Sequence, residues 1–167
     1  MRAAGPASRQ DRWDGYLIVP PPGGKAGEGE LPQQASQEAL ELTISRVVGE
    51  GMHEDLDVHN YARRPLRTQL VVEVDADFAD PEETKGKRRQ KGEITRRWTR
   101  KGGFAHELQI EYSIRRRFAH GAERGTATLR RAVRIRVLHA SSPPRRQGRK
   151  LVFDLALPPN THWHACI

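Results

Sequence analysis

The chain has 167 residues, of which 36% are hydrophobic and 30% are charged, and its formal net charge is +8. This length suits one domain with a single core, and the small apolar fraction predicts a thin core under an extensive solvated surface. The single cysteine, Cys166, excludes an intrachain disulfide and therefore a small secreted scaffold held together by disulfides.

Membrane and export signals are missing from the sequence pattern. No apolar run approaches the roughly 18 residues that a transmembrane helix needs. The N-terminal residues include Arg2, Arg9, Asp11 and Arg12, so they lack the uninterrupted apolar stretch of a signal peptide. We therefore expect a soluble protein of the cytoplasm that has no membrane partner.

The first part of the chain has little periodic pattern. Proline and glycine interrupt residues 20–24, and glycine recurs in residues 27–29, although residues 13–19 are compatible with one short strand. The sequence therefore predicts a poorly structured or truncated N-terminal segment over residues 1–35. It places the folded domain in residues 36–167.

A β-hairpin is predicted directly after that boundary. Leu40, Leu42 and Ile44 alternate with polar residues, which puts all three on one face of a strand. The glycine-containing residues 49–51 supply a turn, and alternation continues over residues 52–61.

More strands follow along the chain. Residues 69–78 alternate again, and Val71 stands among the polar residues of the outer face, so we expect this strand to be covered on both faces at the centre of a sheet. Further strands are predicted at residues 93–98, 104–114, 127–139, 150–157 and 161–166. A near-regular spacing of about eight or more strands predicts an all-β fold, an antiparallel β-sandwich.

A distinctive series of short motifs begins in the second predicted strand. It contains His-Glu, then Asn-Tyr, then an Asp-Ala-Asp-Phe-Ala-Asp loop followed by glycines and arginines. The residues are His53, Glu54, Asn60, Tyr61, Asp75, Asp77, Phe78, Asp80, Gly86, Arg88, Arg89 and Gly92. This order resembles the N-terminal domain of glycogen-debranching proteins of the amylo-α-1,6-glucosidase type.

The resemblance implies that the catalytic residues lie in a different domain. Glycosidic bond cleavage in that family belongs to a separate C-terminal (α/α) barrel that carries the acidic pair. A physical argument agrees, because glycoside hydrolysis needs two carboxylates held across the scissile bond in a cleft. We therefore expect no catalytic residue here, and an accessory domain that packs on or frames the substrate cleft of a glycosidase catalytic domain on the same or a neighbouring polypeptide.

An α-glucan is a candidate ligand of such a domain. An aromatic ring plane matches the apolar side of a pyranose, so a sugar would stack on Trp98, Tyr112 or Trp163. Packing in the core is the alternative role of each of these side chains.

The acidic loop permits two interpretations. Asp75, Asp77 and Asp80 carry oxygen ligands of the kind that Ca²⁺ prefers, but their segment lacks the glycine-containing loop of an EF-hand. Alternatively these carboxylates pair with cations of the same loop and fix its shape. Those cations are Lys87, Arg88 and Arg89. We expect the pairing, with no bound metal and no cofactor.

Three metal-ligating side chains alternate on one face of the last predicted strand. They are His162, His164 and Cys166, and imidazole and thiolate both bind zinc. No further ligand is identifiable near them in the sequence. We therefore predict no zinc site and no nucleophilic role for Cys166.

The basic residues leave one alternative function open. Cations crowd residues 85–101 around Trp98, and Arg130, Arg134 and Arg136 alternate along a later strand, where they are first of all a solvated face. RNA-binding sheets stack bases on several exposed aromatic residues, a motif that this sequence lacks. We do not expect specific recognition of nucleic acid, and the alternative is a stand-alone basic β module that binds nucleic acid or another polyanion.

Overall fold

The computed structural model describes residues 2–4, 11–19, 40–80, 83, 86, 92–100 and 106–167. These residues form strands β1 to β12 and the turns between them, with no helix in the described ranges, so the predicted all-β class is confirmed. A membrane-spanning helix is accordingly not found among them. The chain divides into two compact units, Met1–Val72 with Val137–Ile167 and Glu73–Arg136.

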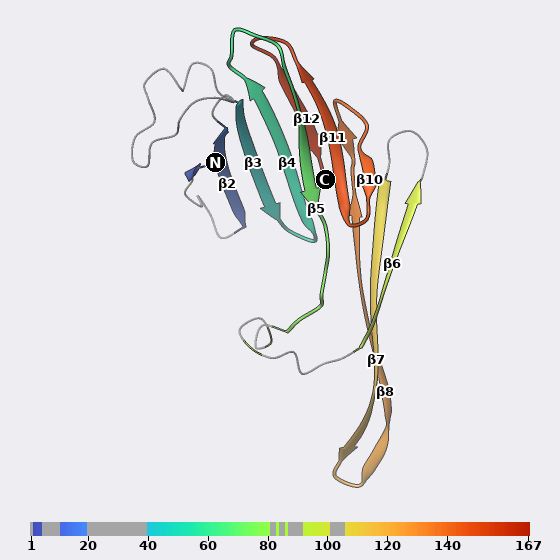
Figure 1. Cartoon of the computed structure of the whole chain (residues 1–167). Helices are drawn as coiled ribbons and strands as arrows, with labels where there is room; N and C mark the ends of the chain where they lie inside the picture. Colours follow the sequence, from blue (N-terminus) through green and yellow to red (C-terminus); the bar gives the residue numbers. More distant parts are fainter. Residues whose placement is uncertain are drawn as a thin grey trace. The chain divides into compact units, whose positions relative to one another are not determined.

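The first unit contains two antiparallel sheets (Figure 1). The larger has the order β1-β2-β3-β4-β12-β9 and the smaller the order β10-β11-β5. The strands of the larger sheet are β1 (Arg2–Ala4), β2 (Arg12–Val19), β3 (Leu40–Val48), β4 (Met52–Asn60), β12 (His162–Cys166) and β9 (His139–Ala140). Those of the smaller sheet are β10 (Arg145–Gln147), β11 (Lys150–Leu157) and β5 (Leu66–Glu73).

The predicted hairpin is β3 and β4. Leu42 pairs with Val58 and Ile44 with Leu56, so the register brings apolar side chains opposite one another on one face. The connecting turn lies at residues 49–51, as the glycines predict.

Aromatic and aliphatic side chains of both sheets form the core of the first unit. Phe153 of β11 and Trp163 of β12 meet edge to face, with ring centroids 5.0 Å apart, and both are buried. Such pairs add about 0.5–1.5 kcal/mol to the stabilisation that comes from buried area. The core also includes Leu42, Leu56, Val58, Leu151, Leu155, Leu157 and Ala165.

Strand β5 differs from its prediction. It ends at Glu73 and lies at the edge of its sheet, and Val71 is 48% exposed, so the expectation of a covered central strand was wrong. One apolar side chain among polar neighbours does not require a second layer, since folded proteins leave many apolar atoms in contact with water.

Strand β2 extends the sheet into residues that we assigned to the N-terminal segment. It pairs with β3 along its whole length, from Arg12 opposite Val47 to Val19 opposite Leu40. Residues 20–39 lie outside the described part of the chain.

The second unit is a three-stranded antiparallel sheet with the order β6-β7-β8. Its strands are β6 (Glu93–Arg100), β7 (His106–His120) and β8 (Glu123–Arg136). Strand β6 pairs with β7 only as far as Ser113, whereas β7 and β8 stay paired to their common turn, where Gly121 has a φ of 58°. Residues 114–120 and 123–129 therefore form a two-stranded ribbon, and seven residues at about 3.4 Å each give it a length of about 24 Å.

The sheet of the second unit has two chemically different faces. Leu108, Ile110 and Tyr112 of β7 share the apolar face and are buried. Arg130, Arg134 and Arg136 of β8 lie on the opposite face and are exposed, as their alternation predicts.

Candidate functional site

The acidic motif forms a loop that ion pairs fasten to the sheet of the second unit. An Oδ1 atom of Asp75 accepts a hydrogen bond of 2.8 Å from Arg96, and Oδ1 of Asp80 lies 3.2 Å from Nη1 of Arg131. The two arginines belong to β6 and β8, the outer strands of the sheet, so the loop is held on both sides. The loop cations that we expected as partners, Lys87, Arg88 and Arg89, lie outside the described residues.

The middle of the loop packs on an aromatic ring. Phe78 has a positive φ of 55°, and its ring stacks on Tyr112 with centroids 5.7 Å apart. Asp77 stabilises this bend, since its Oδ1 accepts the backbone N–H of Ala79 at 3.0 Å. Gly92 closes over the same ring, where a Cβ atom would lie 2.4 Å from Tyr112. The motif residues therefore cover the Tyr112 ring.

The buried carboxylates of the described residues are bonded to other groups of the protein. Oε2 of Glu83 accepts a hydrogen bond of 3.2 Å from the backbone N–H of Asp80. Glu107 pairs with Arg136 at 2.5 Å. Both buried carboxylates thus take part in contacts within the second unit.

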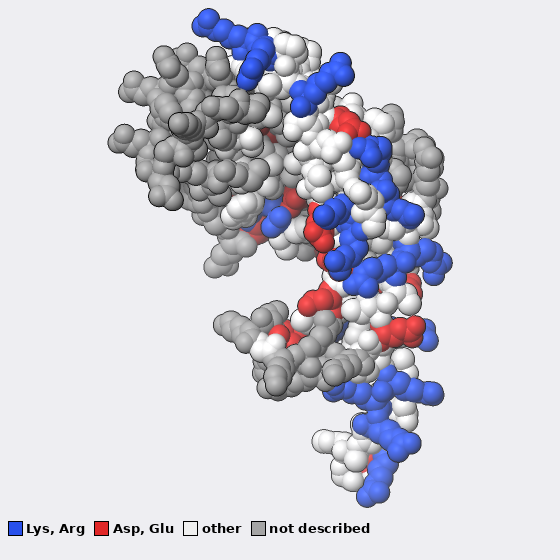
Figure 2. Space-filling model, in the orientation of Figure 1, with Lys and Arg blue, Asp and Glu red and all other residues white. Residues whose placement is uncertain are grey.

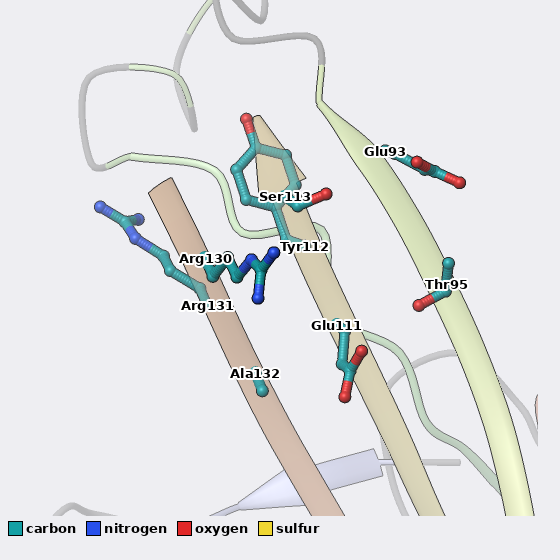
Figure 3. Close-up of a pocket in the computed structure, with 8 residues that line it drawn as sticks. All are labelled: Glu93, Thr95, Glu111, Tyr112, Ser113, Arg130, Arg131 and Ala132. Atoms are coloured by element: carbon teal, nitrogen blue, oxygen red, sulfur yellow. The ribbon is translucent and has the colours of Figure 1, made fainter. Parts of the chain in front are cut away.

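The polar face of the second unit carries an open hollow of about 500 Å³. It is lined by Glu93, Thr95, Glu111, Tyr112, Ser113, Arg130, Arg131 and Ala132 (Figure 3). The Arg130 side chain reaches toward β7, whereas Arg131 points away from it (Figure 3). Glu111 accepts a 2.6 Å hydrogen bond from Gln109. Hydroxyl, carboxylate and guanidinium groups on an open surface suit hydrogen bonding to a polar ligand.

Asn60, from the Asn-Tyr motif, organises the first unit. It is fully buried, and its Nδ2 donates to the carbonyl oxygens of Arg64, Leu157 and Pro158 at 3.0–3.1 Å. Its Oδ1 accepts the N–H of Ala62 at 2.9 Å. One side chain thus joins the turn after β4 to the end of β11, which is a structural role.

Neighbouring motif residues also make structural contacts. Glu54 accepts a 2.6 Å hydrogen bond from Nε of Arg46, whose guanidinium lies 5.4 Å from the centre of the Trp13 ring. Tyr61 stacks on His59 with centroids 4.0 Å apart. These contacts link β2, β3 and β4.

A protein-family model for the N-terminal domain of some glycogen debranching enzymes matches residues 6–167. The chain belongs to this family. The match covers both units and all of the motif residues, so the resemblance drawn from the sequence is confirmed. Neither a curated protein nor a solved structure matches the chain.

The aromatic sugar-contact candidates occupy different environments in this glycogen-debranching N-terminal domain. Trp163 is 3% exposed and its Nε1 donates to Oγ of Ser142 at 2.9 Å, and Tyr112 is 2% exposed. Trp98 keeps a partly exposed side chain. Alternation within the last strand could have placed Trp163 inward, because its neighbours His162 and His164 share the other face.

Sequence reasoning missed the aromatic residues that are exposed in the structure. Among the described residues they are Trp13, Tyr16 and Phe118, and Tyr61, singled out as a motif residue, is exposed as well. Tyr16 and Phe118 lie in runs with weak hydrophobic alternation, where the pattern does not specify a face.

Side chains of the last strand that could bind a metal contact residues of the neighbouring strand. Cys166 lies beside His53 and Asp55 of the neighbouring strand β4, and His164 pairs with Asp57. Burial raises the pKa of the Cys166 thiol, and the Asp55 carboxylate adds to the rise, so the thiol is the favoured form at neutral pH. His162 instead lies opposite His59.

Proposed function

We propose that the chain is a non-catalytic accessory domain of a glycogen-debranching protein. It packs on or frames the substrate cleft of a glycosidase catalytic domain carried by the same or a neighbouring polypeptide. Membership of the family over residues 6–167 carries this proposal. The engagement of Glu83 and Glu107 by other protein groups supports the non-catalytic part, since neither is poised as a general acid.

The proposal includes a weak contact with α-glucan. Among the aromatic residues that the sequence singles out, Trp98 is the one with a partly exposed ring. Its indole would stack on the apolar side of a glucose unit.

Affinity electrophoresis in gels that contain glycogen or pullulan tests the glucan contact. We expect glucan to retard the chain at moderate salt, and Trp98→Ala to remove the retardation. Tyr61→Ala is the matched control, because it removes an aromatic side chain that is 42% exposed in the first unit. Equal retardation of both variants would contradict a Trp98 contact.

Capture experiments test the partner. The tagged chain, incubated with an extract of its own cells at moderate salt, is expected to retain a glycoside hydrolase that mass spectrometry identifies. Recovery of nucleic acid without a glycosidase would contradict the accessory role.

The ribbon of β7 and β8 favours polyanion binding as a second candidate function. Arg115, Arg116, Arg117 and Arg124 are exposed on it, and none forms an ion pair with another described residue. Figure 2 shows cationic side chains gathered along this hairpin. A mobility shift with a random DNA duplex that disappears as salt is raised would support it, because counterion release makes such binding strongly salt-dependent.

A further inference from the structure

Histidine, aspartate and cysteine side chains converge on the outer face of the larger sheet. In the register of β4 and β12, Cys166 lies opposite Asp55 and His164 opposite Asp57. Residues that are directly opposite in antiparallel strands share a face, and so do residues two apart on one strand. His53 therefore belongs to the same face, at the end of β4 where β12 reaches Cys166.

Three of these side chains direct ligand atoms toward one point. Nε2 of His53 lies 3.3 Å from Oδ1 of Asp55 and 3.3 Å from Sγ of Cys166. All three ligand atoms lie within 4.8 Å of one another. Tetrahedral zinc has bonds of about 2.0–2.1 Å to nitrogen and oxygen and about 2.3 Å to sulfur, which place neighbouring ligand atoms roughly 3.3–3.6 Å apart. The observed separations to His53 match that geometry.

A further imidazole, that of His164, lies outside this trio but next to Asp55. Nδ1 of His164 lies 2.8 Å from Oδ1 of Asp57, and its Nε2 lies 3.8 Å from Oδ1 of Asp55. A hydrogen bond from Nδ1–H to a carboxylate leaves Nε2 as an acceptor, which is how carboxylates commonly orient metal-binding histidines. A proton on Nδ1 would therefore leave the lone pair of Nε2 on the side of Asp55.

The donor set indicates which metal fits. Imidazole nitrogen, carboxylate oxygen and thiolate sulfur together suit zinc, whereas Ca²⁺ and Mg²⁺ take oxygen ligands. In the metal-free chain the Cys166 thiol hydrogen-bonds Nε2 of His53. Zinc would displace the thiol proton and bind the sulfur directly.

We propose that His53, Asp55 and Cys166 bind a zinc ion, with His164 as the fourth ligand. The site joins β4 to β12, so the metal cross-links two strands whose ligands are far apart in the sequence. Because zinc binds the folded site and not an equivalent arrangement in the unfolded chain, binding raises the temperature of unfolding.

Zinc titration of the purified 167-residue chain tests the proposal. The chain is prepared with an affinity tag that contains no histidine, stripped with a chelator and dialysed, and zinc binding is measured by competition with a chromophoric chelator. We expect one zinc ion per chain and a higher thermal midpoint with zinc. Cys166→Ser and His53→Gln are each expected to weaken binding by at least tenfold, the lower end of what even supporting residues of metal sites contribute.

A matched control lies on the same strand and face. His162→Gln removes an imidazole two residues from His164 but outside the cluster, so zinc affinity is expected to match the parent. Cobalt supplies a second readout, because a cobalt–thiolate absorption band should form in the parent and be missing from Cys166→Ser.

Two results would overturn the site. One is a parent chain that binds no zinc, and the other is unchanged affinity in both His53→Gln and Cys166→Ser. If Cys166→Ser does not fold, His53→Gln decides the question, since the His53 side chain is 47% exposed and its replacement leaves the core intact.

Discussion

The two units of this chain bury their apolar residues in different ways. In the first unit, side chains from two sheets meet, as Phe153 and Trp163 do across the sandwich. In the second, one sheet carries the apolar face, and the acidic loop lies over part of it through Phe78 and Tyr112. The motif residues therefore have two structural roles. Asn60 links strands of the first unit, whereas Asp75 and Asp80 fix a loop of the second unit.

The largest predicted effect contrasts two phenylalanines. Phe153→Ala in the sandwich should lower the free energy of unfolding by about 3–5 kcal/mol, because it empties a closely packed site. Phe118→Ala, on the ribbon, should change it by no more than about 0.5 kcal/mol, since that ring is 45% exposed. Urea unfolding of both variants measures the free energy of unfolding. Similar losses in the two variants would contradict the difference in burial between the sandwich and the ribbon.

Replacing Asn60 should cause the next largest loss in the free energy of unfolding. Asn60→Ala leaves the carbonyls of Arg64, Leu157 and Pro158 without their donor, so we expect a loss of about 3 kcal/mol. Gln69→Ala is the matched control, because its amide bonds Asp154 at the surface and should be worth under about 0.5 kcal/mol. Equal urea midpoints for the two variants would show that Asn60 does not link the strands.

The ion pairs of the loop should contribute less. Asp75→Ala or Asp80→Ala removes a partly exposed pair, worth about 1 kcal/mol at most. The effect should be local: trypsin cleavage between residues 75 and 96 accelerates roughly fivefold, as expected when about 1 kcal/mol of local stability is lost. An unchanged cleavage rate would mean that the arginines of β6 and β8 do not hold the loop.

The Cys166 thiol should have the smallest effect on stability, and this effect should depend on pH. Folding raises the pKa of this thiol, so the unfolded chain loses the proton first as pH increases. Stability linked to the thiol is complete below the unfolded value of about 8.5 and is lost as pH rises through the folded value. In the presence of chelator, the thermal midpoint of the parent should therefore fall more between pH 8 and pH 10 than that of Cys166→Ser. Parallel midpoints would contradict the shift.

Local patterns were enough to predict much of the fold. Alternation identified β3, β4 and β11, and glycines identified the turn at residues 49–51. These features depend on residues that are close in sequence.

Non-local pairing could not be predicted in the same way. The sequence contains His53 and Cys166 but does not show that β4 and β12 are neighbours, which brings together two residues 113 positions apart. The position of β5 in its sheet was wrongly predicted from Val71 for the same reason. Whether Val71 is exposed depends on which distant segments pack against β5.

We propose that this chain does not itself cleave glucan. The most direct measurement is glucose release from glycogen and pullulan by the purified chain, followed over a range of protein concentrations. We expect no release above the buffer control at any concentration. Release that rises in proportion to the chain, and that disappears in Glu111→Gln or Glu93→Gln at the polar hollow, would contradict it.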